Sequence, residues 1–316
     1  TYDKGVFKLN LKNNIFENFN QVSGLISSTI RSIFIDSKDR IWLSSKNGVS
    51  CVENKIIKNF NRNNGLLQNN INTIGEDLEQ NIWLGTDGSG IYRFTGEEFV
   101  NYTTSSNLPS NYVMSICEDH NENIWLSTYD QGICCLKEGG ITSYNILNSA
   151  INNNTIWTSI CKKGGTLLFG SSAGLVEIKN EIITTYSELD WLPSNKITSL
   201  YEDSKYRLWI GCSKGLAIID KNLKYTFNEA SEFRGRKIRA ICPFKKLTYV
   251  GSSTGIFTFD SELNSRKLSL KKNLSKDIYC LKNWKDSLLF IGSGNGLFVY
   301  DNNSIYQINL HSSFSA

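Results

Sequence analysis

The stretch NIWLGTDGSGIY, residues 81–92, returns along the chain in closely related forms. The related copies are RIWLSSKNGVSC at 40–51, NIWLSTYDQGIC at 123–134 and RLWIGCSKGLAI at 207–218. Aligned on this stretch, seven copies place a bulky residue in the same position: Trp42, Trp83, Trp125, Leu168, Trp209, Tyr249 and Phe290. The copies follow one another every 40 to 43 residues. A repeat of this length is typical of the blade of a β-propeller.

Each copy has the same internal order. An alternating segment such as INTIGED (71–77) comes first, then a polar turn, the Trp segment, a Gly turn and two further apolar segments. Period-two alternation and frequent turn residues predict four short strands per copy. A blade of this kind is apolar on both faces, and stacking blades around an axis covers those faces. The predicted fold class is all-β, a β-propeller of four-stranded antiparallel blades, with seven blades and eight as the alternative.

The first residues of the chain also align with the repeat. TYDKGV at 1–6 matches TYDQGI at 128–133, so residues 1–20 supply third and fourth strands without the two strands that precede them. We expect a single domain over residues 1–316, with seven full repeats plus this N-terminal half repeat, in a chain that is a fragment of a longer protein. The surplus hairpin closes the last blade, displaces the final hairpin or belongs to an eighth blade.

Composition narrows the function classes. The chain carries 34 basic and 30 acidic side chains, and the basic ones are scattered, so no nucleic-acid partner is expected. No apolar run approaches the roughly 18 residues that a spanning helix needs. The eight Cys form no CxxC pair and only two His are present, which disfavours a zinc site and favours buried free thiols. We predict no cofactor and no metal.

Residues that recur in register at every copy are explained by the blade itself. This applies to the Trp column and to an acidic column in the turn after the first segment, made up of Asp36, Glu76-Asp77, Glu118-Asp119 and Glu202-Asp203. Asp favours such tight turns because its side chain bonds the nearby backbone. Gly85, Gly88 and Gly90 resemble a dinucleotide fingerprint, but that motif opens a helix. A strand is predicted to follow here, so we reject the fingerprint.

Residues that differ in type from the same position in the other copies are concentrated in two families of loops. These are the linkers before the first segment and the turns after the Trp segment. The linkers include residues 108–112, 189–196 and 231–237, and the turns include TDGSG (86–90) and TYDQG (128–132). Both families are expected on one rim of a propeller, and a mixture of aromatic and charged residues suits a sugar or another polar ligand. The candidate ligand contacts are Trp191, Arg234, Arg236, Tyr112, Tyr129, Asp130 and Asp87. No residue is assigned a catalytic role.

Two long segments carry a resemblance to a known family. LPSNYVMSICEDHNENIWLSTYDQGI at 108–133 and LPSNKITSLYEDSKYRLWIGCSKGL at 192–216 resemble the two-component regulator propeller repeat. That repeat forms the extracytoplasmic sensor region of bacterial hybrid histidine kinases and related regulators. The resemblance covers nearly the whole chain and is strongest over residues 27–220. It weakens in the last two copies, where Tyr249 and Phe290 replace Trp.

The resemblance implies a non-enzymatic ligand-sensing propeller on the periplasmic or extracellular side of the inner membrane. Many members of the family detect oligosaccharides, so the expected partner is a small polar ligand of that kind. The resemblance also implies attachment to membrane-bound signalling domains in the full-length protein, and it allows a homodimer. It gives no ligand identity, because the repeats share no binding signature.

Two other function classes remain as alternatives. Streptogramin lyases are propellers with a similar repeat, but they need a metal and a catalytic His. His120 is expected in the turn away from the candidate rim, and His311 falls in the C-terminal tail. A protein-interaction scaffold of the WD40 kind is the other alternative, although the Gly-His and Trp-Asp pairs of that repeat are missing.

Overall fold

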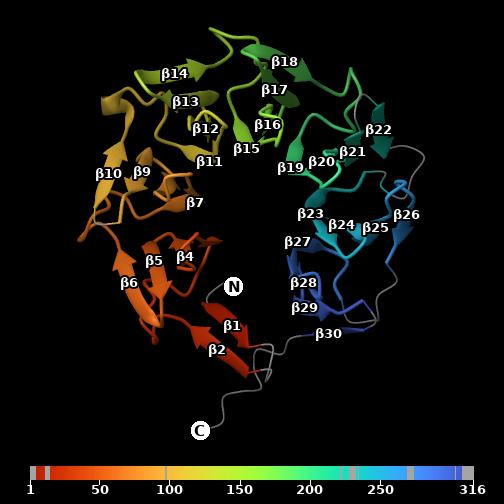
Figure 1. The fold of residues 1–316 in the computed structure, drawn as a ribbon, viewed down its shortest axis with the longest axis horizontal. Helices are drawn as coiled ribbons and strands as arrows, with labels where there is room; N and C mark the ends of the chain where they lie inside the picture. Colours follow the sequence, from red (N-terminus) through yellow and green to blue (C-terminus); the bar gives the residue numbers. More distant parts are fainter. Residues whose placement is uncertain are drawn as a thin grey trace. The chain divides into compact units, whose positions relative to one another are not determined.

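The regular elements of the part that the structure describes are β-strands, apart from one short 3-10 helix, η1 (Thr104–Ser106). The computed structural model describes residues 5–10, 15–96, 98–220, 223–227, 233, 235–268, 274–302 and 304–307. Its strands form seven four-stranded sheets, each built from consecutive strands in chain order, and one two-stranded sheet (Figure 1). The predicted fold class, a β-propeller of seven four-stranded antiparallel blades, is confirmed.

The chain divides into two compact units, residues 1–161 with 165–169 and residues 162–164 with 170–316. The first unit opens with a hairpin of β1 (Val6–Asn10) and β2 (Ile15–Phe19). Blade 1 consists of β3 (Ser32–Ile35), β4 (Ile41–Ser45), β5 (Gly48–Glu53) and β6 (Ile56–Phe60). Blade 2 consists of β7 (Ile71–Glu76), β8 (Ile82–Thr86), β9 (Ile91–Phe94) and β10 (Phe99–Tyr102). Blade 3 consists of β11 (Val113–Glu118), β12 (Ile124–Thr128), β13 (Ile133–Lys137) and β14 (Gly140–Tyr144).

Blade 4 contains the boundary between the units, with its first strand in the first unit and its last two in the second. Its strands are β15 (Ile156–Cys161), β16 (Leu167–Ser171), β17 (Leu175–Lys179) and β18 (Ile182–Tyr186). Blade 5 consists of β19 (Ile197–Glu202), β20 (Leu208–Cys212), β21 (Gly215–Asp220) and β22 (Leu223–Phe227). Blade 6 consists of β23 (Ile238–Phe244), β24 (Leu247–Ser252), β25 (Gly255–Phe259) and β26 (Ser265–Lys267). Blade 7 consists of β27 (Ile278–Trp284), β28 (Leu288–Ser293), β29 (Gly296–Tyr300) and β30 (Ile305–Gln307).

Consecutive blades share one recurring interface. In the first unit, Trp42 and Val49 of blade 1 pack against Ile71 and Leu84 of blade 2. The equivalent residues of the second unit, in blades 5 and 6, form a core in the same way. Every residue of β8 is buried, whereas every residue of β10, the edge strand of the same blade, is half-buried. The Trp strand is therefore the centre of each blade, and the fourth strand meets solvent.

The Trp column is anchored by the acidic column. The indole Nε1 of each Trp donates a hydrogen bond to the carboxylate of an Asp six residues earlier in the sequence. The pairs are Trp42 with Asp36 (2.8 Å), Trp83 with Asp77 (2.6 Å), Trp125 with Asp119 (2.7 Å) and Trp209 with Asp203 (2.9 Å). These Asp residues are buried, and each also accepts backbone N–H groups of its own turn. The structural interpretation of both columns is confirmed.

The Glu of each acidic pair makes a different contact from the Asp. The sequence did not suggest this difference. The Glu accepts a backbone N–H from the matching turn of the preceding blade. Glu76 accepts from Ser37, Glu118 from Leu78 and Glu202 from Lys163, each at 2.8 Å. Asp therefore holds the Trp of its own blade, and Glu joins that blade to the one before it.

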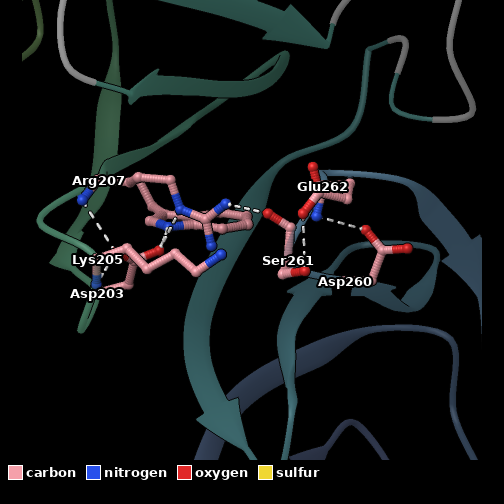
Figure 2. A network of polar contacts seen from close by, with 7 residues as sticks. Asp203, Lys205, Arg207, Asp260, Ser261 and Glu262 are labelled. Carbon is pink, nitrogen blue, oxygen red and sulfur yellow. Dashed lines mark hydrogen bonds and ion pairs between the residues drawn. The ribbon is translucent and has the colours of Figure 1, made fainter.

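Blades 5 and 6 carry an additional link through Arg207. Its Nε donates to Asp203 at 2.7 Å, and its NH1 donates to the backbone carbonyl of Ser261, in the turn after β25, at 2.9 Å (Figure 2). The guanidinium also lies over the Trp209 ring, 5.6 Å from its centroid. Because Arg207 is only 5% exposed, this charge relies on Asp203 for its partner.

The N-terminal hairpin forms a two-stranded sheet of its own, and the final repeat supplies all four strands of blade 7. Val6 and Phe19 pack against Leu25 and Leu43 at the start of blade 1. The final hairpin is thus not displaced. The single-domain interpretation and the role of the half repeat in the longer protein stay predictions, and Thr1–Lys4 lie outside the described residues.

All eight cysteines are free. Burial raises the pKa of Cys117 and Cys134 to about 12, so these thiols stay protonated at neutral pH. Cys280 differs from the expected buried thiols because its residue is exposed.

Candidate functional site

The two loop families come together in the first unit. The backbone N–H of Asp87, in the turn after β8, donates to Asn70 in the linker before β7 at 3.0 Å. Asp87 also forms an isolated antiparallel bridge with Tyr112, in the linker before β11. In blade 3 the N–H of Tyr129 donates to the carbonyl of Tyr112 at 3.0 Å. Backbone bonds therefore fix three predicted ligand contacts beside one another.

The turn after β8 depends on Gly90. Its φ is +70°, in the left-handed region, and a Cβ at this position would lie 2.0 Å from the carbonyl oxygen of Tyr102. Only glycine fits such a close approach. The N–H of Gly90 donates to the carbonyl of Asn111 at 2.9 Å, so the turn of blade 2 is joined to the linker of blade 3.

A cavity of about 520 Å³ opens where these loops meet. It is lined by Asn72, Asp87, Tyr112, Met114, Tyr129, Asp130 and Trp157. Small-molecule sites in proteins commonly enclose about 300 to 1,000 Å³. Four of the seven lining residues were predicted as ligand contacts from the sequence. All seven lie at the start of a first strand or just beyond the end of a second strand.

One part of the cavity lining is aromatic. Tyr129 meets Trp157 edge to face, with 5.6 Å between ring centroids. Tyr112 and Tyr129 are 44% and 51% exposed. Exposed rings held in place by backbone bonds give flat apolar surfaces with a polar hydroxyl at one end, which suits ligands that have both apolar faces and hydrogen-bonding groups.

The acidic part of the lining consists of Asp87 and Asp130. Oδ2 of Asp87 accepts a hydrogen bond from Nδ2 of Asn70 at 2.6 Å, and Oδ1 of Asp130 accepts one from the Ser110 hydroxyl at 2.5 Å. An ionised carboxylate has about four lone-pair positions. Each Asp therefore keeps acceptor capacity for hydroxyl or N–H donors of a ligand.

Three lining residues, Asn72, Met114 and Trp157, were missed in the sequence because they lie on strands, where alternation assigns side chains to the fold. Asn72 and Met114 are skipped by the pairing between the first and second strands of their blades, so both occupy β-bulges. Bulges re-aim a side chain and are common beside functional sites. The available signal was the variety of residue types at this position from copy to copy.

The other candidate residues lie elsewhere. Trp191, in the second unit, packs edge to face on Tyr186 at 5.6 Å. Arg236, also in the second unit, donates to the Thr254 hydroxyl and lies over Phe257, 5.7 Å from the ring centroid. Arg234 falls outside the described residues. Neither Trp191 nor Arg236 is among the residues that line the cavity of the first unit.

A second cavity, of about 340 Å³, lies near the turn between β11 and β12, at the other end of these strands. Its lining includes Asp77, Trp83 and Glu118, which belong to the anchoring columns, and Arg93, whose guanidinium lies over the Trp83 ring. Since Asp77 and Glu118 already serve the blade, we take the cavity with the unassigned side chains as the candidate functional site. His120 lies in the turn between β11 and β12 and does not line that site.

Three segments of the chain, residues 24–47, 107–130 and 192–214, match the two-component regulator propeller family. These matches confirm the resemblance that the sequence motif indicates. The second segment carries Tyr112, Tyr129 and Asp130 of the candidate site. No curated protein matches the chain in sequence.

Solved structures with the same fold include extracellular and bacterial surface proteins. The extracellular domain of BT4673 from B. thetaiotaomicron, named as a hybrid two-component system, is 21% identical with a TM-score of 0.67 over 90% of this chain and 41% of that chain. PorZ, a surface component of the type-IX secretion system of Porphyromonas gingivalis, is 14% identical with a TM-score of 0.64 over 91% of this chain and 49% of that one. The chain thus spans about half the length, or less, of these proteins.

A virginiamycin B lyase from Staphylococcus aureus has a TM-score of 0.61 at 14% identity, over 84% of this chain and 92% of that chain. At such identities the likeness shows a shared propeller fold. The described part of the chain contains no helix long and apolar enough to cross a membrane.

Proposed function

We propose that the chain is the ligand-sensing propeller of an extracytoplasmic sensor in a two-component signalling protein. It binds a small polar ligand in the cavity at Tyr112 and Tyr129, without chemical conversion of the ligand. The regulator propeller repeats support the signalling role. The observation that carries the binding role is the convergence of four variable loop residues, Asp87, Tyr112, Tyr129 and Asp130, on one cavity.

The ligand class follows from the lining. Among the described residues, two carboxylates and no basic side chain line the cavity, so neutral ligands are favoured over anions. Aromatic faces pack on the apolar faces of sugar rings, while carboxylates accept hydrogen bonds from hydroxyl groups. A neutral oligosaccharide has both kinds of surface.

Signalling would use the position of the cavity, which is lined by residues of three consecutive blades. A bound ligand touches the turn after β8 and the loops on both sides of β11 and β12, so it favours one arrangement of these loops over others. Such a shift in population changes how the surface packs against a neighbouring domain or a second subunit. The membrane-bound signalling domains are the expected recipients of that change.

Titration calorimetry with cellotriose, xylotriose, maltotriose and trigalacturonate tests the proposal. We expect one or more neutral trisaccharides to bind and trigalacturonate not to bind. Tyr129→Ala and Asp87→Asn should each weaken binding by at least about tenfold, the effect of losing roughly 1.4 kcal/mol. Tyr206→Ala is the matched control, because Tyr206 is an exposed tyrosine (62%) in the turn between β19 and β20. Binding of none of the trisaccharides, or equal affinity in all three variants, would overturn the proposal.

The residues of the second unit require a separate test. Trp191 and Arg236 were inferred as contacts from their loops alone, and the double variant Trp191→Ala/Arg236→Ala should lower ligand affinity if they contribute. Unchanged affinity in calorimetry removes both from the site.

A further inference from the structure

The first strand of the blades carries a bulge at one recurring position. Pairing with the second strand skips one residue in blades 2, 3, 5, 6 and 7. The skipped residues are Asn72, Met114, Thr198, Arg239 and Tyr279. Arg31 in blade 1 and Trp157 in blade 4 hold the same place, directly after the apolar residue that opens the strand.

This position holds six different residue types in the seven blades, with Arg occurring twice, while the residue before it hardly varies. The residue just before each of them is Ile or Val, and in blades 2 to 7 that residue is at most 1% exposed. The buried neighbour is uniform because every blade needs it for packing. The bulge residue is free to vary because the fold does not use its side chain in one constant way.

Bulge residues of consecutive blades contact one another. NH1 of Arg31 donates to Oδ1 of Asn72 at 3.0 Å. Nδ2 of Asn72 donates to the carbonyl of Val113 at 3.2 Å and lies 3.9 Å from Sδ of Met114. In the second unit, Arg239 pairs with Asp277 and lies over the Tyr279 ring, 4.7 Å from its centroid. The bulge positions therefore form a row from blade 1 to blade 3 in the first unit and from blade 6 to blade 7 in the second, and Trp157 lines the same cavity as Asn72 and Met114 of the first row.

We propose that the side chain at the bulge position of a blade contacts the ligand and determines which ligand is bound. This rests on the proposed function, because it assigns specificity within the same cavity. Asn72, Met114 and Trp157 supply three of the seven lining residues and are specificity-determining. Arg31 is a positioning residue, since its bond to Oδ1 of Asn72 fixes which way the amide points.

The row in the first unit changes in character along its length. It runs from a cation and an amide at Arg31 and Asn72 to a thioether and an indole at Met114 and Trp157. A ligand lying along it meets hydrogen-bonding groups at one end and an apolar surface at the other. The loop residues Asp87 and Asp130 supply acceptors beside the row.

Met114 is the only methionine of the chain, which allows a direct test. Protein labelled with 13C at the methionine methyl group gives a single assigned resonance in NMR, and Met114→Leu confirms the assignment. Any trisaccharide that binds in calorimetry should shift this resonance. Phenol, at millimolar concentration, is a second probe, which should shift it by packing on the aromatic lining, and Trp157→Leu should abolish that shift.

The role of these residues in ligand specificity is tested by exchanging two of them between blades. The double variant Asn72→Met/Met114→Asn keeps both bulges and the same overall composition, and it should change the affinity order of the three trisaccharides. Arg31→Ala should weaken the ligand that depends on Asn72, and Arg31→Lys should restore part of the loss. Val113→Ala is the control, because loss of a fully buried side chain lowers the melting temperature without altering the affinity order.

The outcomes separate the two proposals. If no trisaccharide binds but phenol shifts the Met114 resonance in a Trp157-dependent way, the proposed ligand class is wrong. The inference that the bulge residues contact the ligand is then retained. If a trisaccharide binds while the Met114 resonance stays fixed and the exchange variant keeps the affinity order, the bulge inference is overturned and the sensor function stands. A Met114 resonance that neither probe moves also overturns the inference.

Discussion

The two ends of the pair formed by the first and second strands of a blade are very different. At the turn that joins them, blades 1, 2, 3 and 5 repeat one arrangement, an Asp that accepts a hydrogen bond from a Trp indole. At the opposite end, where the first strand begins and the second stops, the loop and bulge residues differ from blade to blade. The same strands thus carry a uniform end that builds the fold and a variable end that forms the candidate site.

This difference separates two kinds of constraint on a repeat. A side chain that makes the same packing contact and hydrogen bond in each blade, as Trp and Asp do in blades 1, 2, 3 and 5, is held to one residue type in those copies. A side chain that faces a cavity is constrained only by what the cavity holds. Variants at the two ends should therefore differ in kind, with losses of stability at the uniform end and losses of binding at the variable end.

The largest loss is expected for Trp209→Ala. The indole is fully buried and bonded to Asp203, so its removal leaves a cavity and takes one hydrogen-bond donor from the carboxylate, at a cost of about 3 to 5 kcal/mol in the free energy of unfolding. Urea unfolding followed by circular dichroism measures it. The comparison predicts a clearly smaller loss for Trp157→Ala at the variable end, and equal losses would break it.

Asp203→Asn should cost about 3 kcal/mol, because it leaves the buried Arg207 charge without its partner. The matched variant is Asp260→Asn, in a neighbouring turn (Figure 2), where the half-buried Asp accepts hydrogen bonds from backbone N–H groups of its own turn. A smaller shift in the urea midpoint is expected for Asp260→Asn. If the two variants behave alike, burial of the Arg207 pair adds nothing.

Acid should weaken the uniform end of the blades. Burial opposes ionisation of Asp36, Asp119 and Asp203, but hydrogen bonds from the Trp indoles and neighbouring groups outweigh it, so the pKa of each carboxyl lies below its ordinary value. A carboxyl with a lowered pKa stabilises the folded state above its unfolded pKa of about 3.9, and the contribution is lost as pH falls through the lower folded value. The free energy of unfolding should therefore fall below about pH 4, less steeply in Asp203→Asn than in the unaltered chain.

Tyr112→Ala should have the smallest effect on stability, within about 0.5 kcal/mol, because its side chain is 44% exposed. Thermal unfolding measures this, and calorimetry on the same sample measures the expected loss of ligand affinity. A large drop in stability would place Tyr112 with the anchoring residues and remove the contrast between the two ends.

The fold could be predicted from the sequence because the recurring Trp and Asp residues mark the packing of the blades. Sequence reasoning found Asp87, Tyr112, Tyr129 and Asp130 because loop residues that leave a column have no packing reason to do so. It missed Asn72 and Met114, because a bulge is a matter of strand pairing and leaves no mark in the alternation. It missed Trp157 because this residue lies on a strand, where alternation assigns the side chain to the fold. Trp191 was an equally good loop candidate, but only coordinates show that its ring packs on Tyr186.

The bonds from Glu76, Glu118 and Glu202 to the preceding blade are head-to-tail contacts, with the donor on one blade and the acceptor on the next. Contacts of this kind can be repeated without limit, so they specify which blade follows which but not how many there are. Gain or loss of a whole repeat during evolution would leave every remaining link satisfied. It would also create a new pair of adjacent variable ends, and a duplication could therefore change the recognition properties of the protein in a single genetic event.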